Sequence, residues 1–117
     1  MTEVTIRRWQ DHTTWLTVST PGPGAIDAIT TELTHVRSGA TALIDLTDAG
    51  AFTAEFATPL RQAVERAVQQ GVHVVVAASD LEARLAMVAV DLEHLAPLPQ
   101  SRRDAMAFLS TVIAQAS

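Results

Sequence analysis

Asp45 and Asp48 are the first residues of this chain whose type and position could carry chemistry, because they follow the apolar segment 40–46. An aspartate at the carboxyl end of a strand can accept a phosphoryl group. That reaction also needs an acidic pair after an earlier strand, to hold magnesium, and a lysine after a later strand. The chain has no such pair and no lysine. We therefore expect Asp45 and Asp48 to bond backbone N–H groups of the loop that follows them.

The histidines and serines do not form the patterns of a metal centre or of an activated nucleophile. The four histidines include no i,i+4 pair and no HExxH motif, so structural roles or plain exposure are expected for His12, His35, His73 and His94. The serines lie in turn or cap contexts outside any GxSxG motif, and the chain has no cysteine. The stretch GPGAID lacks the third glycine of a dinucleotide-binding turn. We predict no enzyme activity, no catalytic residue, no metal ion and no cofactor.

Length and composition indicate one domain that spans residues 1–117, since 48% of the residues are hydrophobic and can fill one core. The net charge of −5 offers no basic face, so nucleic acid is not an expected partner. The apolar runs are shorter than the roughly 18 residues that a membrane span needs, and MTEVTIRRWQ is unlike a signal peptide. With no cysteine, these features predict a cytoplasmic protein with no membrane partner.

The first half of the chain alternates between strand and helix patterns. Residues 3–10 and 15–20 are predicted to form two strands joined as a hairpin around Gln10–Thr13, with Trp9 and Trp15 packed in or beside the sheet. The PGPG stretch at 21–24 is expected to be irregular. Ile26, Ile29, Leu33 and Val36 then recur at helical spacing, with Gly39 as the stop, and segment 40–46 is typical of a central parallel strand.

The second half repeats this alternation. A helical stripe ends at Gly71, and its start is predicted near Phe56–Thr58 with Thr58 as N-cap, because Pro59 suits only a first turn. Residues 72–78 form the next predicted strand. Ser79 and Glu82 form a capping-box pattern before a helix with one apolar face, namely Leu81, Leu85, Val88, Leu92 and Leu95. LAPLP is interpreted as a short edge strand, and Ser101 as the cap of a last helix. Alternating strands and helices predict an α/β fold.

Three stretches carry a resemblance to a known family. TALIDLTDAGAF looks like that family's third strand and loop, and residues 60–71 with VHVVVAAS look like the helix and strand that follow. LEARLAMVAVDLEHLAPLPQSRRDAMAFL is similar to the family's ending of helix, turn, proline-containing strand and capped helix. Over residues 41–109 the chain resembles a STAS domain, the fold of bacterial anti-sigma factor antagonists (SpoIIAA-like). The resemblance implies a mixed sheet, mostly parallel central strands and about four helices.

The same resemblance points to a loop that has lost its phosphorylation motif. In phosphorylatable members the loop after the third strand ends in D-S-[ST]-G, and a serine kinase that is also the anti-sigma factor phosphorylates the second hydroxyl residue. In that register this chain has Thr53, Ala54, Glu55 and Phe56. The resemblance implies that Glu55 is the phosphosite equivalent. The switch loop, residues 48–58, also includes Asp48, Thr53, Ala54, Phe56 and Thr58.

Glu55 and its neighbours leave alternatives open. A helix N-terminus stabilises negative charge, so Glu55 either mimics a permanent phosphate or is a helix-start glutamate with no signalling role. Phe56, where the family has glycine, either tucks into the core or makes a new partner contact. Thr53 is an alternative phosphoacceptor.

We interpret the chain as a non-enzymatic regulator in transcription control. It is expected to bind a serine kinase/anti-sigma factor, or another protein of a STAS pathway, through the switch loop and the face of the helix at 59–70. One alternative is a small-molecule, nucleotide or anion sensor with a pocket between that loop and Thr20–Gly24. Another is a non-phosphorylatable scaffold subunit of a STAS assembly. A homodimer is a possible state.

Overall fold

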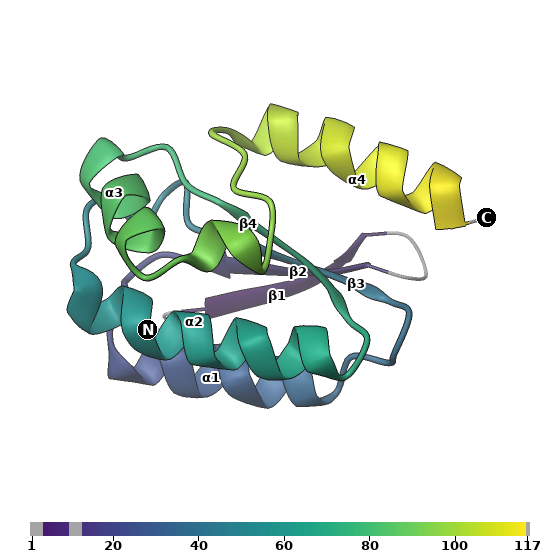
Figure 1. Ribbon diagram of the computed structural model, residues 1–117, viewed down its shortest axis with the longest axis horizontal. Helices are drawn as coiled ribbons and strands as arrows, with labels where there is room; N and C mark the ends of the chain where they lie inside the picture. The colour runs from purple at the N-terminus through teal and green to yellow at the C-terminus, as the bar shows by residue number, and fades with distance from the viewer. Residues whose placement is uncertain (1–3, 10–12, 117) are drawn as a thin grey trace.

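The computed structural model describes residues 4–9 and 13–116, and these residues form one mixed sheet with helices on both faces. The strand order is β1 (Val4–Trp9), β2 (Thr13–Val18), β3 (Thr41–Asp45) and β4 (His73–Ala77). β1 and β2 are antiparallel, whereas the β2–β3 and β3–β4 pairs are parallel (Figure 1). The helical elements are α1 (Pro23–Thr34), α2 (Ala54–Gln69), α3 (Leu81–Ala89), the 3₁₀ turn η1 (Leu92–His94) and α4 (Arg102–Ala116). The predicted α/β class, with a mixed sheet and four helices, is confirmed.

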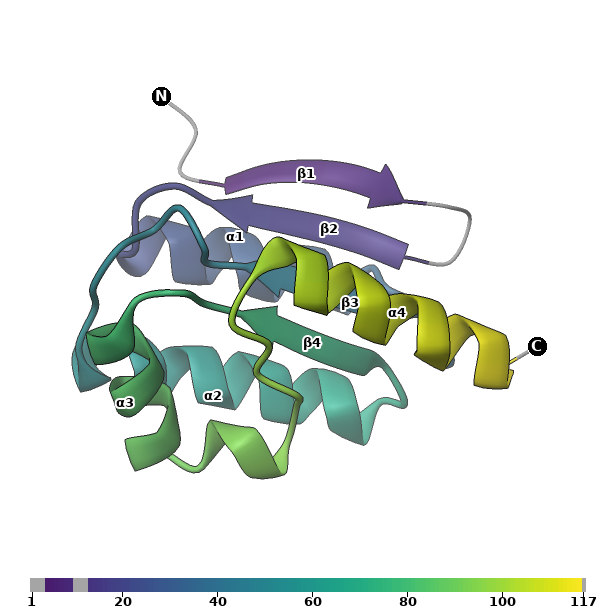
Figure 2. The same cartoon turned by 90° about the horizontal axis from the view of Figure 1, so that it is seen from above.

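The two faces of the sheet are covered unequally. α1 and α2 lie together on one face, and α4 crosses the other (Figures 1 and 2). The core of the α1–α2 face is extensive. Among the side chains that the structure describes, the core under α4 comprises Leu43, Val75, Ala77, Ala105 and Leu109, with half-buried Trp15 against it. None of the helices in the described ranges is both long and apolar enough to span a membrane.

β3 shows why a continuous apolar run belongs in the centre of a sheet. All its residues are buried. Successive side chains of a strand point to opposite faces, so Ala42 and Ile44 pack toward α1 and α2 while Leu43 packs toward α4. The prediction of a central parallel strand here is confirmed.

The predicted N-terminal hairpin is also present. β1 and β2 pair in register from Val4 opposite Val18 to Trp9 opposite Thr13. The predicted turn lies mostly in residues 10–12, which include His12. These residues are outside the ranges that the structure describes. The side chain of Trp9 is likewise outside them.

α1 starts earlier and ends earlier than the sequence suggested. It begins at Pro23, so the second half of PGPG is helical; proline suits the first helical position because its missing N–H has no partner there. The helix ends at Thr34, before Gly39. Gly39 has a φ of 87° and instead serves the turn into β3, where its N–H donates to Gly71 O at 2.8 Å.

The leucine stripe predicted to face the core after β4 is wrong for most of its length. α3 ends at Ala89, and the side chains of Leu81, Leu85 and Val88 are 72%, 60% and 43% exposed. The helix instead buries Ala83 and Met87. Leu92 is buried, but it belongs to η1.

The N-cap of α3 is Asp80 and not Ser79. The Asp80 carboxylate accepts from the Ala83 N–H at 3.0 Å. Ser79 Oγ donates instead to Gln100 O at 2.9 Å, which ties the start of α3 to the segment before α4. The N-cap therefore lies one residue after the predicted one, and Ala83 at the third position cannot complete a capping box.

The LAPLP segment runs beside β4 without becoming a strand. Val76 N–H donates to Pro97 O at 3.0 Å and Ala78 N–H donates to Pro99 O at 3.1 Å. Prolines 97 and 99 cannot return these bonds because they lack an N–H, so the interpretation as an edge strand is wrong in detail. Ser101 caps α4 as predicted, with Asp104 N–H donating to its Oγ at 3.1 Å.

Candidate functional site

The switch loop leaves β3 at its carboxyl end and continues into α2. α2 begins at Ala54, with extended Thr53 as its N-cap, and Thr53 O accepts from the N–H groups of Phe56 and Ala57, both at 3.0 Å. The predicted start near Phe56–Thr58 is wrong, and Thr58 is not the N-cap. Pro59 lies inside the helix, where it removes one backbone bond.

Packing explains why α2 continues through this proline. The face that includes Phe56, Ala57, Leu60 and Val64 is buried on both sides of Pro59 along the helix. Burial of such side chains contributes about 1.5–3 kcal/mol each, so several of them offset one lost hydrogen bond. Sequence reasoning applied the proline rule and gave too little weight to the apolar face.

The residues of the switch loop divide into exposed and buried groups. Thr53, Ala54, Glu55 and Thr58 are exposed, and Glu55 lies in the first turn of α2. Phe56 is 6% exposed, and its ring centroid is 4.9 Å from that of Phe52 with the planes tilted by 59°. Of the two alternatives for Phe56, the structure therefore gives the core position. A carboxylate, not the phenyl ring, meets solvent at the helix start.

Asp45 is the most constrained carboxylate near this loop. It is fully buried, and its Oδ1 accepts from Thr47 N at 3.0 Å and from Thr47 Oγ1 at 2.6 Å. Its Oδ2 accepts from Trp15 Nε1 at 3.1 Å and from Arg102 Nε at 2.7 Å. The expected bond to a loop N–H is therefore present, together with two partners from distant elements.

Burial alone raises the pKa of Asp45, but the donors reverse this effect. The hydrogen bonds from Thr47 Oγ1, Arg102, the Thr47 N–H and Trp15 together hold the pKa of Asp45 below its ordinary value. In turn, the bonds to Asp45 and then Asp48 raise the pKa of Arg102. Asp45 is thus an ionised structural anchor, with its lone pairs directed at protein donors rather than at a reacting group.

Asp48 belongs to the same network. Arg102 Nη2 donates to Asp48 Oδ2, so this guanidinium links the switch loop to the first residue of α4. A cation at the start of a helix is disfavoured by the helix dipole, and the two carboxylates compensate for it. Sequence reasoning missed Arg102 and Trp15 as partners, because they lie 57 and 30 residues from Asp45 and no local spacing connects them.

A pocket of about 540 Å³ lies between the switch loop and the segment before α1. This is where the sensor alternative placed one. Its wall is mainly apolar, with two exposed carboxylates: Asp27, the fifth residue of α1, and Glu55, in the first turn of α2. The apolar lining comprises Pro21, Pro23, Ile26, Phe52, Phe56 and Pro59.

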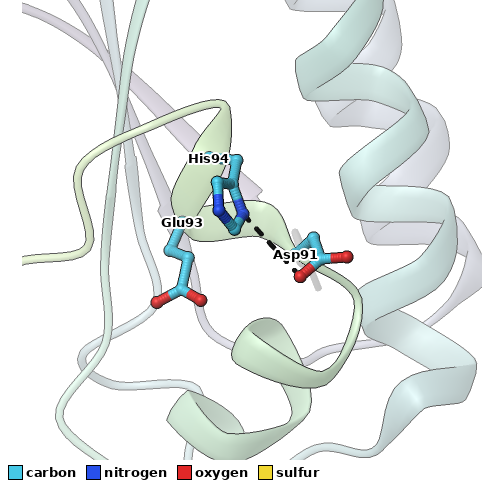
Figure 3. A group of neighbouring side chains, drawn as sticks. All are labelled: Asp91, Glu93 and His94. Carbon is cyan, nitrogen blue, oxygen red and sulfur yellow. Dashed lines mark ion pairs between the residues drawn. The ribbon is translucent and has the colours of Figure 1, made fainter.

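One group of side chains has donor types that suit a metal ion. Asp91, Glu93 and His94 offer ligand atoms within 4.8 Å of one another (Figure 3). All three are exposed, and His94 Nδ1 is 3.7 Å from Asp91 Oδ1. The group lies on the short η1 turn, away from the switch loop in the sequence. Such exposed acidic groups are common on protein surfaces, and we assign no function to it.

The other described histidines occupy ordinary positions. His35 Nδ1 lies 2.8 Å from Thr31 O at the end of α1, and His73 is exposed at the start of β4. Both fit the expected structural or exposed roles.

Sheet order and helix placement together define the class of fold to which this chain belongs, that of the STAS domains. The structure is similar to that of an anti-sigma-factor antagonist (STAS) domain protein from Planctomyces limnophilus, with a TM-score of 0.68 and 13% sequence identity. The similarity covers 92% of this chain and 97% of that chain. No family model matches the sequence, and no curated protein matches it. The fold expected from the resemblance is confirmed.

Proposed function

We propose that this chain is a non-enzymatic regulatory protein of the anti-sigma factor antagonist type, which acts by binding a protein partner. The observation that supports this most directly is the STAS fold itself, in which Glu55 lies exposed in the first turn of α2. By the resemblance of the sequence, this would be the position of the family's phosphorylatable hydroxyl. The partner would be a serine kinase/anti-sigma factor or another protein of such a pathway. The protein would act in the bacterial cytoplasm, as a single domain.

The binding surface would consist of the exposed residues of the switch loop and the exposed face of α2. Thr53, Glu55 and Thr58 offer a short polar and charged surface, with the small side chain of Ala54 among them. Asp48 is held by Arg102, so its role would be to fix the loop rather than to contact the partner. Glu55 would stand in place of the phosphoacceptor, so the switch would no longer respond to a kinase.

Mass spectrometry after incubation with ATP and the serine-kinase anti-sigma factors of the same genome tests the loss of the phosphoacceptor. We expect no added phosphate on the wild-type chain and one on Glu55→Ser. Phosphate on wild-type Thr53 or Thr58 would contradict the proposal. Glu82→Ser is the matched control, because Glu82 occupies the same second position of α3 that Glu55 occupies in α2.

Binding measured by calorimetry with the same kinases tests the partner. We expect Glu55→Ser to change the affinity and Glu82→Ser to leave it unchanged. If no kinase binds either form, the antagonist function is wrong. If binding occurs and Glu55→Ser neither changes it nor gains phosphate, Glu55 is structural.

A further inference from the structure

We infer that the pocket between α1 and α2 binds a small organic cation with an apolar body, such as an aromatic amine. Its volume of about 540 Å³ lies within the range of about 300–1,000 Å³ that is usual for small-molecule sites. The inference concerns the isolated chain and does not depend on the proposed partner.

The wall of the pocket selects an apolar body. Phe52 and Phe56 are 6% exposed each and are held by their mutual ring contact, so this side of the pocket is preformed. Ile26 and Pro59 complete an apolar wall from α1 and α2. A planar or aliphatic group of a ligand can be desolvated here without displacing a polar group of the protein.

The charges at the pocket select the sign of the ligand. The first turns of both helices contribute to it, and each helix N-terminus carries roughly half a positive charge. Asp27 and Glu55 together contribute two negative charges, and no lining residue is basic. About one negative charge therefore remains, and the pocket attracts a cation.

This charge balance favours a cation over the nucleotide or anion that the sensor alternative named. An anion could use free N–H groups at two helix N-termini, but here Pro23 removes one donor and each helix has its own carboxylate at the pocket. A phosphate would face both carboxylates. An ammonium group would lie between them while its apolar body contacts the phenyl rings.

Titration with a pair of probes of equal size and opposite charge tests the inference. Tryptamine and indole-3-propionate share the indole ring and differ in the charged end, and binding is followed by NMR at the Ile26 methyl and the Phe52 and Phe56 ring resonances. We expect saturable shifts with tryptamine and an affinity for it at least about fivefold above that for the acid. Equal binding of both probes, tighter binding of the acid, or no saturable shift with tryptamine would overturn the inference.

Variants separate the charge from the cavity. The double variant Asp27→Asn and Glu55→Gln is expected to remove the preference for tryptamine, whereas Glu82→Gln with Asp104→Asn, which changes the net charge equally outside the pocket, keeps it. A preference that survives the double charge variant would also overturn the inference.

The cavity is tested by a bulky side chain at its wall. Ala51→Trp is expected to block the pocket and Ala54→Trp to leave it open, because Ala51 lines it and Ala54 does not, although both are exposed. Failure here leaves the kinase experiments unaffected.

Discussion

At the scale of single residues, we expect the hydrogen bonds of buried Asp45 to contribute strongly to the free energy of unfolding. Each of its two oxygens accepts two hydrogen bonds in a fully buried position. In Asp45→Asn one oxygen becomes an NH₂ group that faces two donors. We expect the free energy of unfolding, measured in urea, to fall by about 1–3 kcal/mol. Asp48→Asn is the control: its side chain is 59% exposed, so less than about 1 kcal/mol should be lost. Equal losses would mean that burial of Asp45 contributes little.

The ionisation of Asp45 should also make the stability of the protein depend on pH. The pKa of Asp45 is lowered in the folded protein, so folding favours its ionised form. This contribution is complete above the unfolded pKa, about 3.9, and is lost as the pH falls through the lower folded value. We expect the unfolding free energy of the wild type to drop more steeply below about pH 4 than that of Asp45→Asn, as measured by urea unfolding from pH 2 to 7. Parallel curves would contradict the lowered pKa.

The Asp45 network also shows how far single-residue reasoning extends. An aspartate after a buried strand predicts a bond to the next loop N–H, and Thr47 supplies it. The bonds from Trp15 and Arg102 depend on β2 and α4 reaching the same edge of β3. That proximity is a property of the tertiary fold, so no spacing along the chain encodes it.

At the scale of elements, the start of α3 distinguishes two adjacent capping candidates. Asp80→Ala removes an N-cap bond and should lower the unfolding free energy by about 1 kcal/mol. Ser79→Ala removes only a bond from an exposed hydroxyl to Gln100 O and should cost less. The two values come from parallel urea unfolding curves. A larger loss for Ser79→Ala would restore the capping box that the sequence pattern suggested.

The elements themselves were predictable, but their ends and faces were less so. Hydrophobic periodicity located every strand and the four helices. It failed where packing overrides a local rule, as at Pro59, which is kept inside α2 by the buried face around it. It also failed at α3. Apolar spacing predicted that Leu81 and Leu85 face the core, but the buried residues of this helix are Ala83 and Met87.

For the candidate site, the resemblance pointed to the loop at 48–58 and the sensor alternative to a pocket beside it, and the structure gives the exposure of the loop and the lining of the pocket. The exposure of Glu55 and burial of Phe56 follow from the start of α2 at Ala54, which the proline rule had displaced. The sign of the charge at the pocket depends on Asp27 of α1 and Glu55 of α2 lining the same pocket. Asp27 and Glu55 are far apart in the sequence, so local spacing does not indicate that both line this pocket.

At the scale of the whole molecule, the two layers of helices are attached to the sheet unequally. α1 and α2 share a large core with the sheet, whereas the described part of α4 buries Ala105 and Leu109. Arg102 adds the polar attachment of α4 to Asp45 and Asp48. Segments with little buried apolar area open at a lower free energy than the global transition. We therefore expect α4 to open at a lower free energy than the sheet.

Amide hydrogen exchange can measure this order of opening. In Arg102→Ala the first turn of α4 loses its attachment and leaves the buried Asp45 without its guanidinium. We expect amides of α4 and of the loop at 46–50 to exchange faster by about tenfold or more, while those in β3 and α2 change only with the global stability. Arg103→Ala is the matched control, because Arg103 is the next residue of the same helix turn and is exposed. A uniform increase over all helices in Arg102→Ala would mean that α4 unfolds only with the whole domain. Faster exchange confined to α4 and the loop would identify Arg102 as the residue that connects the switch loop to the opposite layer of the fold.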